Sequence, residues 1–113
     1  QSEIQTIYGQ LQEILRVKIE PAPDEWDRSY NVDFFIKVKE KVYIGLQIKP
    51  AGAISQIPQI FKERGIQAET HRKFKEKYGG NVFYVFSVNE GDKKVIGNAD
   101  VIDQIKAELK RLG

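Results

Sequence analysis

The sequence predicts an α/β fold in which a mixed central sheet is flanked by helices. Three observations support this fold class: adjacent segments alternate with the period of strands, both ends of the chain have helical periodicity, and a helical stretch separates two apolar strands. That stretch is long enough for a crossover between parallel strands. The expected element order is α-β-β-α-β-(β)-α, and the 113 residues are expected to form one domain, 1–113.

The N-terminal helix is expected over residues 3–19, with Ser2 as its N-cap. Its apolar residues follow three- and four-residue spacings, at Ile4, Ile7, Leu11 and Ile14. Pro21 and Pro23 should end this helix, because proline disrupts a helix interior. Residues 22–30 are then expected to form a loop.

Two strands are expected over residues 31–38 and 42–49, joined as a hairpin by the polar turn Lys39-Glu40-Lys41. The second strand alternates strictly between apolar and other residues. Its apolar face carries Val42, Ile44, Leu46 and Ile48, and its other face carries Tyr43, Gly45, Gln47 and Lys49. On this second face Gly45 should leave open space above the sheet, which we interpret as the place of a site.

A basic helical region is expected from Ser55 to Tyr78; Gly65 could divide it, and Gly79-Gly80 should end it. Residues 81–88 are nearly all aromatic or β-branched, which is typical of a strand buried on both faces. A short edge strand is expected at 93–96. The last helix should start near Asn98 or Asp100, and its apolar stripe consists of Val101, Ile105, Leu109 and Leu112.

The composition excludes several kinds of site. Cysteine is absent and there is a single histidine, so disulfides, thiolate zinc sites and multi-histidine zinc centres are excluded. A bound metal would have mainly oxygen ligands, which favours magnesium, manganese or calcium. The longest apolar run is far shorter than a membrane span and no secretion leader is present, so we expect a cytoplasmic protein without a membrane partner.

Methionine is absent as well, so residue 1 is not an initiator. We expect the chain to be processed or excised from something longer. The absence of Cys and Met, together with many Lys and Glu residues, is a composition typical of thermophile proteins.

The net charge of +2 is unevenly distributed along the chain. Acidic residues concentrate in residues 20–33 and basic residues in residues 55–80. A basic helical segment after an acid-bearing strand region would suit a nuclease, with a metal on one element and phosphate contacts on the next. From charge alone, an ordinary solvated helix face explains the basic segment equally well.

Asp33, Gln47 and Lys49 are the strongest candidates for a functional site. Folding of the two strands as a hairpin would bring a carboxylate, an amide and an ammonium group onto one patch of the sheet. Aspartate is depleted in strands, so Asp33 among apolar neighbours needs either a partner or a functional role. This combination can hold a hard divalent cation through oxygen ligands and place a lysine beside a phosphate.

This arrangement resembles the PD-(D/E)xK nuclease superfamily, which includes type II restriction endonucleases, Mrr-like restriction nucleases and archaeal Holliday-junction resolvases. The similarity is closest to an archaeal type II restriction endonuclease with the Mrr-like Gln-x-Lys variant, here Gln47-Ile48-Lys49. The resemblance implies a restriction-endonuclease-like core and a single nuclease-like domain.

The resemblance also implies roles for particular residues. Asp33 and Gln47 would bind Mg²⁺ or Mn²⁺, together with a backbone carbonyl near Ile48. Lys49 would contact the scissile phosphate and the attacking water. Glu13, from the pattern Gly9-Gln10-Leu11-Gln12-Glu13, would add a ligand, although a plain surface glutamate explains Glu13 equally well. Two departures from the family pattern are Val32 in place of proline and Gln47 in place of an acid.

The function that the resemblance implies is a divalent-metal-dependent DNA endonuclease of the restriction type, acting as a homodimer on double-stranded DNA. Phosphate contacts are expected from basic residues of the helical region: Lys62, Arg64, His71, Arg72 and Lys73. Because Gln47 replaces an acid, a catalytically inactive nuclease-like domain that binds DNA or a protein remains an alternative. A small interaction domain whose polar strand face is coincidental is a third.

Overall fold

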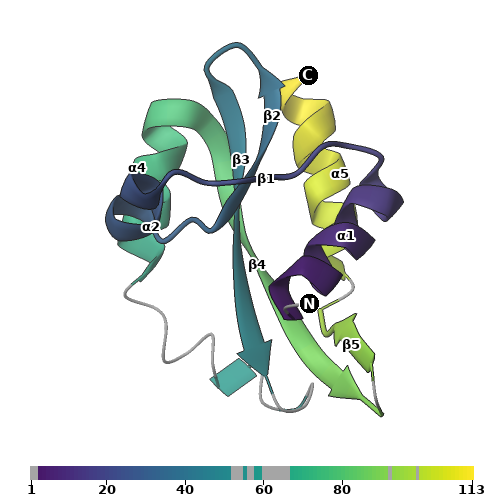
Figure 1. Cartoon of the computed structure of the whole chain (residues 1–113). Coiled ribbons are helices and arrows are strands. Elements are labelled where there is room, and N and C mark those ends of the chain that lie inside the picture. Colours follow the sequence, from purple (N-terminus) through teal and green to yellow (C-terminus); the bar gives the residue numbers. More distant parts are fainter. Residues whose placement is uncertain (1–2, 52–54, 56–57, 60–66, 92, 99) are drawn as a thin grey trace.

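The computed structural model describes residues 3–51, 55, 58–59, 67–91, 93–98 and 100–113. Its elements, in chain order, are α1 (Glu3–Leu15), β1 (Glu20–Pro21), α2 (Asp24–Tyr30), β2 (Phe34–Lys39), β3 (Val42–Ala51), α4 (Gln67–Tyr78), β4 (Gly79–Glu90), β5 (Lys93–Ile96) and α5 (Asp100–Leu112). The strands form one sheet in the order β1-β2-β3-β4-β5 (Figure 1). No helix within these described residues has the length and apolarity needed to cross a membrane.

The sheet is mixed, as the sequence predicts. β2 and β3 pair antiparallel as the expected hairpin, with Phe34 opposite Leu46. β3 and β4 pair parallel from Gly45 opposite Val82 to Ala51 opposite Val88, which confirms the predicted parallel pairing. β5 adds an antiparallel edge strand to β4, also as predicted.

Helices cover both faces of the sheet. In Figure 1, α1 and α5 lie on one side of the strands, and α2 and α4 lie on the other. The first side holds the main apolar core, which includes the predicted apolar face of β3 and the stripes of α1 and α5: Ile7, Leu11, Ile44, Leu46, Ile48, Val85, Val101 and Ile105. The apolar face of β3 predicted from the sequence therefore does face the main core, as expected.

The second side is packed mainly by aromatic rings. Trp26 of α2 contacts Phe74 and Tyr78 of α4, with ring centroids 5.2 and 4.7 Å apart, and reaches Tyr43 of β3 at 5.5 Å. Aromatic pairs of this kind stabilise a structure beyond the area that they bury. They hold the two helices of this face against each other and against the sheet.

The first helix ends earlier than predicted, at Leu15 rather than residue 19. Arg16 adopts a left-handed backbone conformation with φ of 57°, and its N–H still bonds to the Gln12 carbonyl at 2.8 Å. The Gln12 side chain then accepts the N–H of Ile19 at 2.8 Å. A left-handed residue thus ends α1 before either proline is reached.

The loop predicted at residues 22–30 is wrong, because most of it is helix α2. Pro23 stands at its N-cap position, and Asp24, Glu25 and Asp27 occupy its first turn. Proline is favoured near a helix start, and negative charge there is stabilised by the helix dipole. The short strand β1, which pairs with β2, was likewise not predicted.

β3 extends to Ala51, two residues beyond the predicted end at residue 49, and includes Pro50. Pro50 lies two residues after Ile48, so the backbone nitrogens of both residues point to the same side of β3. On that side β3 no longer pairs with β2, and the N–H that proline lacks is not needed there. A proline is tolerated at such an unpaired edge. Of the predicted basic helix Ser55–Tyr78, the part Gln67–Tyr78 is confirmed as α4, and Gly65 lies outside the described residues.

Gly45 does not leave open space above the sheet, contrary to expectation. A Cβ atom at this position would lie 2.9 Å from Cγ2 of Val82 and 3.0 Å from Cγ2 of Val32, with Phe74 of α4 at 3.3 Å. Gly45 therefore allows α4 to approach the sheet closely. The polar face of β3 becomes partly accessible only further along, at the half-buried Lys49, which follows the buried Gln47.

A β-bulge occurs where β4 begins to pair with β3. Tyr43 faces Gly79 and Gly45 faces Val82, so β4 has one extra residue between these two pairs. The buried carboxylate of Glu108 on α5 accepts the backbone N–H of Asn81 at 2.7 Å and its side-chain amide at 2.8 Å. Arg111 donates to the same carboxylate at 2.7 and 2.8 Å. Glu108 thus satisfies polar groups at the bulge.

We expect Gly80→Ala to destabilise the fold by about 3 kcal/mol, because overpacking against a fixed backbone is costly. A Cβ at Gly80 would lie 2.1 Å from the carbonyl oxygen of Tyr43, which cannot move aside as a side chain can. Gly9→Ala is the matched control: nothing lies within 4 Å of its added Cβ. This variant should gain about 0.5–1 kcal/mol from helix propensity. Urea unfolding of both variants measures the difference in stability. Equal stabilities would contradict the close contact between Gly80 and the Tyr43 backbone.

We expect Glu108→Gln to lower the free energy of unfolding by about 1–3 kcal/mol near neutral pH, because four N–H donors, two of Asn81 and two of Arg111, lose a charged acceptor. The Arg111 guanidinium holds the pKa of Glu108 below its usual range. A carboxyl group whose pKa is lowered by folding stabilises the fold at pH values above its pKa in the unfolded chain. This stabilisation is lost as the pH falls through its pKa in the folded chain. The deficit should therefore shrink in acid. Asp103→Asn, exposed on the same helix, should show no comparable deficit.

Candidate active site

A pocket of about 560 Å³ opens beside the end of the β2–β3 pairing. It is lined by Ala22, Asp24, Asp27, Asn31, Val32, Asp33, Phe34, Gln47, Ile48, Lys49 and Pro50. The three residues on which the sequence prediction rests, Asp33, Gln47 and Lys49, are all among them. They come from two segments that the hairpin brings side by side.

Asp33 lies one residue before β2, not within a strand as predicted. Its N–H bonds to the Leu46 carbonyl at 2.9 Å, directly beyond the end of the β2–β3 pairing. Its side chain then takes the place of the departing strand, since Oδ2 accepts the N–H of Ile48 at 3.0 Å. The carboxylate is thereby held at the point where β2 leaves β3.

The pKa of Asp33 is raised above its ordinary value. Burial is the main cause, and the Asp27 carboxyl of α2 acts in the same direction through its charge and a hydrogen bond. The N–H of Ile48 and the positive charge of Lys49 oppose this shift. Two carboxyl groups, from α2 and from the segment before β2, are therefore in contact at the pocket.

The side chain of Gln47 is buried, and only 3% of its surface is exposed. Its Oε1 lies 3.1 Å from Nε2 of His71 on α4. The sequence analysis placed His71 among the phosphate contacts. In the structure its ring is half-buried, packs against Tyr84 with centroids 5.2 Å apart and contacts the site through Gln47.

Asn31 connects the two helices of this face. It caps α2 in the left-handed conformation, with φ of 58° and ψ of 43°, and its side-chain amide donates to the Thr70 hydroxyl of α4 at 2.8 Å. Burial lowers the pKa of His71, and the positive charge of Lys49 lowers it further. A hydrogen bond to the Asn31 backbone acts in the opposite direction. The link from α2 to Gln47 thus runs through His71.

The structure does not bring Glu13 to this pocket. Glu13 is exposed on α1, whose buried residues belong to the core on the other side of the sheet. Ile48 does line the pocket, and its N–H is the group that Asp33 binds. Asp27 is the acidic neighbour of Asp33 that the sequence analysis missed, because its segment was taken for a loop. The acidic residues following Pro23 were the signal for a helix there.

The predicted DNA-contact residues are only partly within the described structure. Lys62 and Arg64 lie outside the described residues. Arg72 is exposed on α4, and its guanidinium pairs with Glu69 and Glu76 one turn away on either side. Lys73 is exposed beside it. The charge of Arg72 is therefore already directed to two carboxylates on its own helix.

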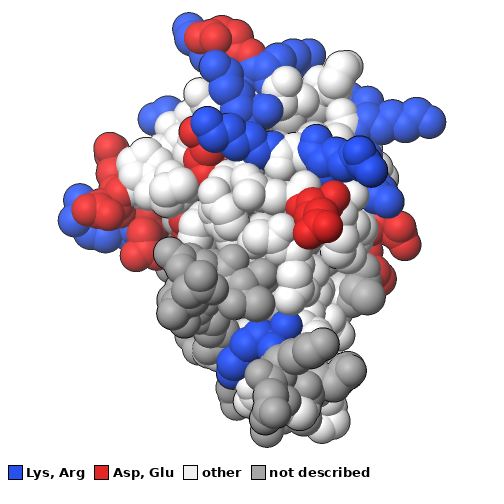
Figure 2. Space-filling model, turned by 45° about the vertical axis from the view of Figure 1, so that its right-hand side comes forward, with Lys and Arg blue, Asp and Glu red and all other residues white. Residues whose placement is uncertain are grey.

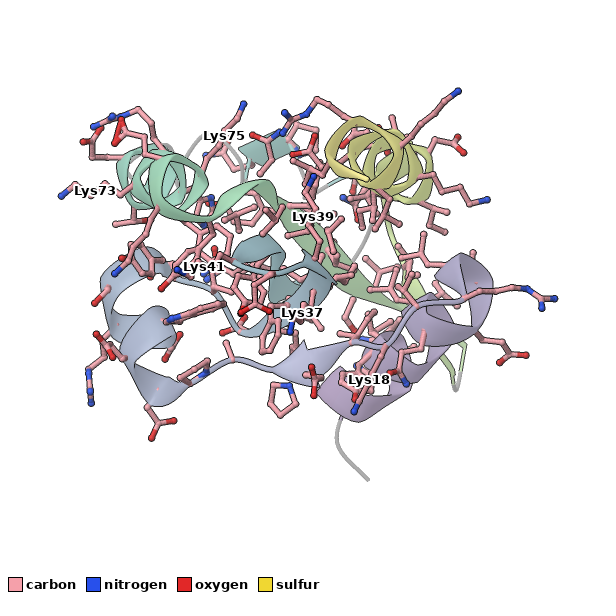
Figure 3. All side chains as sticks on the ribbon, turned by 90° about the horizontal axis from the view of Figure 1, so that it is seen from above. Lys18, Lys37, Lys39, Lys41, Lys73 and Lys75 are labelled. Carbon is pink, nitrogen blue, oxygen red and sulfur yellow. The ribbon has the colours of Figure 1, made fainter. Side chains whose placement is uncertain are left out.

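Basic side chains also gather at the hairpin end of the molecule. Lys and Arg residues cluster toward the upper end of the face in Figure 2. Seen from above, Lys37, Lys39 and Lys41 come from the hairpin, and Lys73 and Lys75 from α4 (Figure 3). Lys49 lies near the other end of β3, about 20 Å along the strand from the hairpin at 3.3 Å per residue. This basic end and the pocket are therefore separate features.

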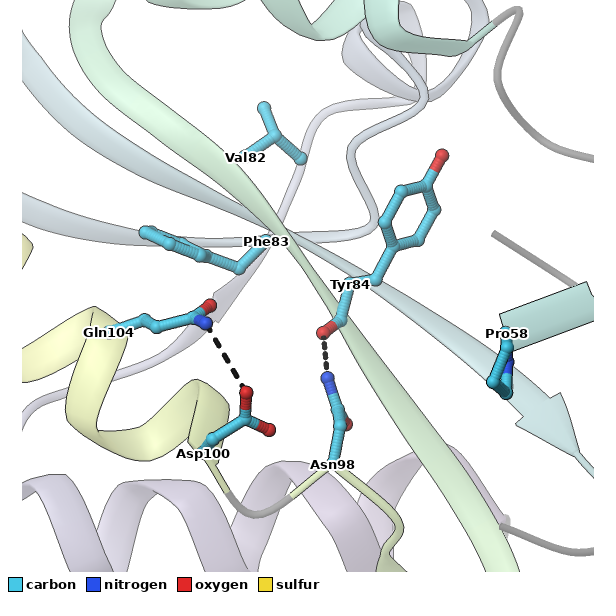
Figure 4. Close-up of a pocket in the computed structure, with 7 residues that line it drawn as sticks. All are labelled: Pro58, Val82, Phe83, Tyr84, Asn98, Asp100 and Gln104. Carbon is cyan, nitrogen blue, oxygen red and sulfur yellow. Dashed lines mark hydrogen bonds between the residues drawn. The ribbon is translucent and has the colours of Figure 1, made fainter. Parts of the chain in front are cut away.

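A second pocket, of about 470 Å³, lies over β4 and the start of α5 (Figure 4). Among the described residues, none of the predicted site residues lines it; the described part of its wall consists of Pro58, Val82, Phe83, Tyr84, Asn98, Asp100 and Gln104. The polar side chain of Asn98 has a structural role there, because its amide donates to the Tyr84 carbonyl at 2.8 Å and accepts the N–H of Phe86 at 3.0 Å. We therefore place the candidate active site in the first pocket.

The donors of the first pocket fit a hard divalent cation. Among the described residues, no group of three or more His, Asp or Glu residues is arranged to hold a metal ion. Magnesium does not require such a group, since it retains several waters and is bound through one or two carboxylates. Asp33, with Asp27 beside it and the Gln47 amide on the same pocket, provides oxygen donors of this kind.

Comparison with known proteins gives a match at the level of the family. No curated protein and no solved structure matches the chain. A family model described as MjaI restriction endonuclease matches residues 1–108, nearly the entire chain. The match supports a nuclease function and DNA as the substrate, and it agrees with the predicted restriction-endonuclease-like core. The chain therefore belongs to the MjaI restriction endonuclease family.

Proposed function

We propose that this chain is a divalent-metal-dependent endonuclease that hydrolyses phosphodiester bonds in DNA. The observation that carries the proposal is the convergence of Asp33, Gln47 and Lys49 on one pocket, at the point where β2 leaves β3. Membership of a restriction endonuclease family supplies the class of substrate. Each of the three side chains has a distinct chemical use in such a reaction.

Asp33 and Gln47 would hold Mg²⁺ or Mn²⁺, together with the backbone carbonyl of Ile48. Asp27 would take the part expected of Glu13, because Asp27 lines the pocket and Glu13 does not. When bound, the cation polarises the phosphate and lowers the pKa of water. Asp33 and Asp27 favour its binding, since a cation relieves the repulsion between two neighbouring carboxylates.

Lys49 would bind the scissile phosphate. It lies two residues after Gln47, so both side chains leave the same face of β3. Its ammonium group can stabilise the negative charge that develops on the phosphate oxygens and can orient the attacking water. The half-buried position of Lys49 strengthens this effect, because charges interact more strongly where water is partly excluded.

Cleavage of both strands of duplex DNA requires two active sites, and one chain provides one candidate site. We therefore propose that the active form is a homodimer. Lys62, Arg64 and Lys73 remain our proposals for sequence-independent phosphate contacts. Arg72 would first have to leave its two carboxylate partners.

The alternative function is a nuclease-like domain that binds DNA without cutting it. The observation that favours it is Gln47, a neutral residue in the place of an acid. Cleavage assays with magnesium or manganese separate the two functions, because only the endonuclease converts plasmid DNA to open-circular or linear forms. Binding in calcium without any cleavage in magnesium or manganese would favour the alternative.

We expect Lys49→Ala to lower the rate of plasmid cleavage by about 10²–10³-fold, as for other groups that stabilise charge in a transition state. DNA binding in calcium should change far less, because one phosphate contact is lost. Lys106→Ala is the control, since Lys106 is exposed on α5 across the sheet from the pocket. Equal cleavage by both variants would remove Lys49 from the mechanism.

We expect Asp33→Asn to abolish measurable cleavage and yet to stabilise the metal-free protein slightly. Asparagine can still accept the N–H of Ile48, but it does not repel Asp27. The gain should not exceed about 1 kcal/mol, because half-exposed charges are screened. Because the pKa of Asp33 is raised in the folded chain, ionisation of Asp33 destabilises the fold as the pH rises through that pKa. The gain should therefore grow with pH and disappear in acid.

Thermal unfolding at several pH values checks this prediction. Magnesium should raise the melting temperature of the unmodified chain and leave that of Asp33→Asn unchanged, because a ligand stabilises only the state that binds it. Glu25→Gln, an exposed change on α2, serves as the control and should respond to magnesium as the unmodified chain does. A variant that is less stable than the unmodified chain at neutral pH would show that the Asp33 carboxylate is needed for folding.

A further inference from the structure

His71 stands between the proposed site and the end of α2. Its Nε2 lies 3.1 Å from the amide end of Gln47, and the ring has a second hydrogen bond with the Asn31 backbone. It also packs against Tyr84, with ring centroids 5.2 Å apart. The ring is therefore held from three sides, by β3, by the α2 C-cap and by β4.

These two hydrogen bonds determine which ring nitrogen carries the proton. The bond to the Asn31 backbone favours a protonated nitrogen, as a bond to a carbonyl oxygen does. A carbonyl can only accept, so the nitrogen that faces Asn31 must be the donor. A neutral imidazole has one N–H, which leaves Nε2 with a lone pair toward Gln47. Histidine is mainly neutral at pH 8, well above its ordinary pKa.

The amide of Gln47 must then face this lone pair with its NH₂ group. An amide has almost the same shape after a half-turn about its last bond, so its partners decide which end points where. An oxygen placed 3.1 Å from an unprotonated Nε2 would bring two acceptors together. The half-turn replaces this contact with an N–H···N hydrogen bond and directs Oε1 away from His71.

We propose that His71 is a positioning residue that turns the oxygen of the Gln47 amide toward the pocket. Gln47 lines that pocket together with Asp33 and Lys49, so the oxygen faces the place proposed for the divalent cation. This inference rests on the proposed function for its purpose, although the orientation itself exists without any cation. It assigns His71 a role inside the site in place of a contact with DNA.

The orientation matters because Gln47 stands where an acid is usual. A carboxylate offers an oxygen in either orientation, whereas an amide offers one oxygen and one NH₂ group. The carboxyl groups of Asp33 and Asp27 attract the NH₂ end, which would point the wrong group at a cation. Engaging the NH₂ group with His71 prevents this, and the left-handed Asn31 in turn holds the ring.

Nitrogen NMR of the metal-free chain at pH 8 tests the orientation directly. We expect His71 as the Nδ1-protonated tautomer, with an unprotonated Nε2 that is coupled through a hydrogen bond to the side-chain nitrogen of Gln47. His71→Phe keeps an aromatic ring against Tyr84 and should remove that coupling. An Nε2-protonated ring, or a ring protonated on both nitrogens, would overturn the proposal, because Nε2 would then hold the oxygen of Gln47.

Calorimetric titration with manganese tests the consequence for the site. We expect His71→Phe to weaken binding by about fivefold to tenfold, which is the size of effect that one hydrogen bond supports. In a Gln47→Glu background the same change should cause no loss, since a carboxylate needs no orientation. Equal weakening in both backgrounds would show a merely structural role for His71 and overturn the proposal.

The two experiments separate this inference from the proposed function. If Gln47→Ala leaves manganese binding unchanged, Gln47 is not a ligand and that part of the proposed function fails. The tautomer measurement still decides whether His71 orients the amide. If Gln47→Ala weakens binding and His71→Phe does not, the metal site stands and the positioning role of His71 is overturned.

Discussion

The hydrogen bond between the Asp33 carboxylate and the N–H of Ile48 is the interaction on which the site depends. β3 is the central strand, and it loses β2 as a neighbour halfway along its length while it continues beside β4. A strand that loses a neighbour exposes backbone groups that need new partners. Asp33 satisfies one of them, and in doing so it is held beside Gln47 and Lys49. The end of the pairing is thus also the start of the pocket.

The same device recurs elsewhere in the sheet. Glu108 accepts the N–H of Asn81 at the bulge of β4, and Asn98 pairs with the backbone of Tyr84 and Phe86 near the end of β5. Each polar side chain serves backbone groups of the sheet, often at a point where its regular pairing changes. Glu108 is paired with Arg111, and Asn98 lines the second pocket. Asp33 differs because a second carboxyl, an amide and an ammonium group share its pocket.

The helices of the aromatic face add what the hairpin alone lacks. Trp26, Phe74 and Tyr78 hold α2 and α4 together over β3, with Gly45 allowing the close approach. This packing brings Asp27 next to Asp33 and brings His71 next to Gln47. The pocket is therefore built from three layers of contact: strand pairing, helix packing and the hydrogen bonds that link them.

The sequence by itself determined the alternation of β3, the hairpin, the parallel pairing with β4 and the membership of Asp33, Gln47 and Lys49 in one patch, because strand periodicity is a local property. Only the tertiary structure decided where α1 ends, that residues after Pro23 form α2, and that Gly45 is covered. It also decided that Asp27 and His71 are neighbours of the site while Glu13 is not. These outcomes depend on contacts between residues far apart in the chain, and such contacts leave no periodic signal in the sequence.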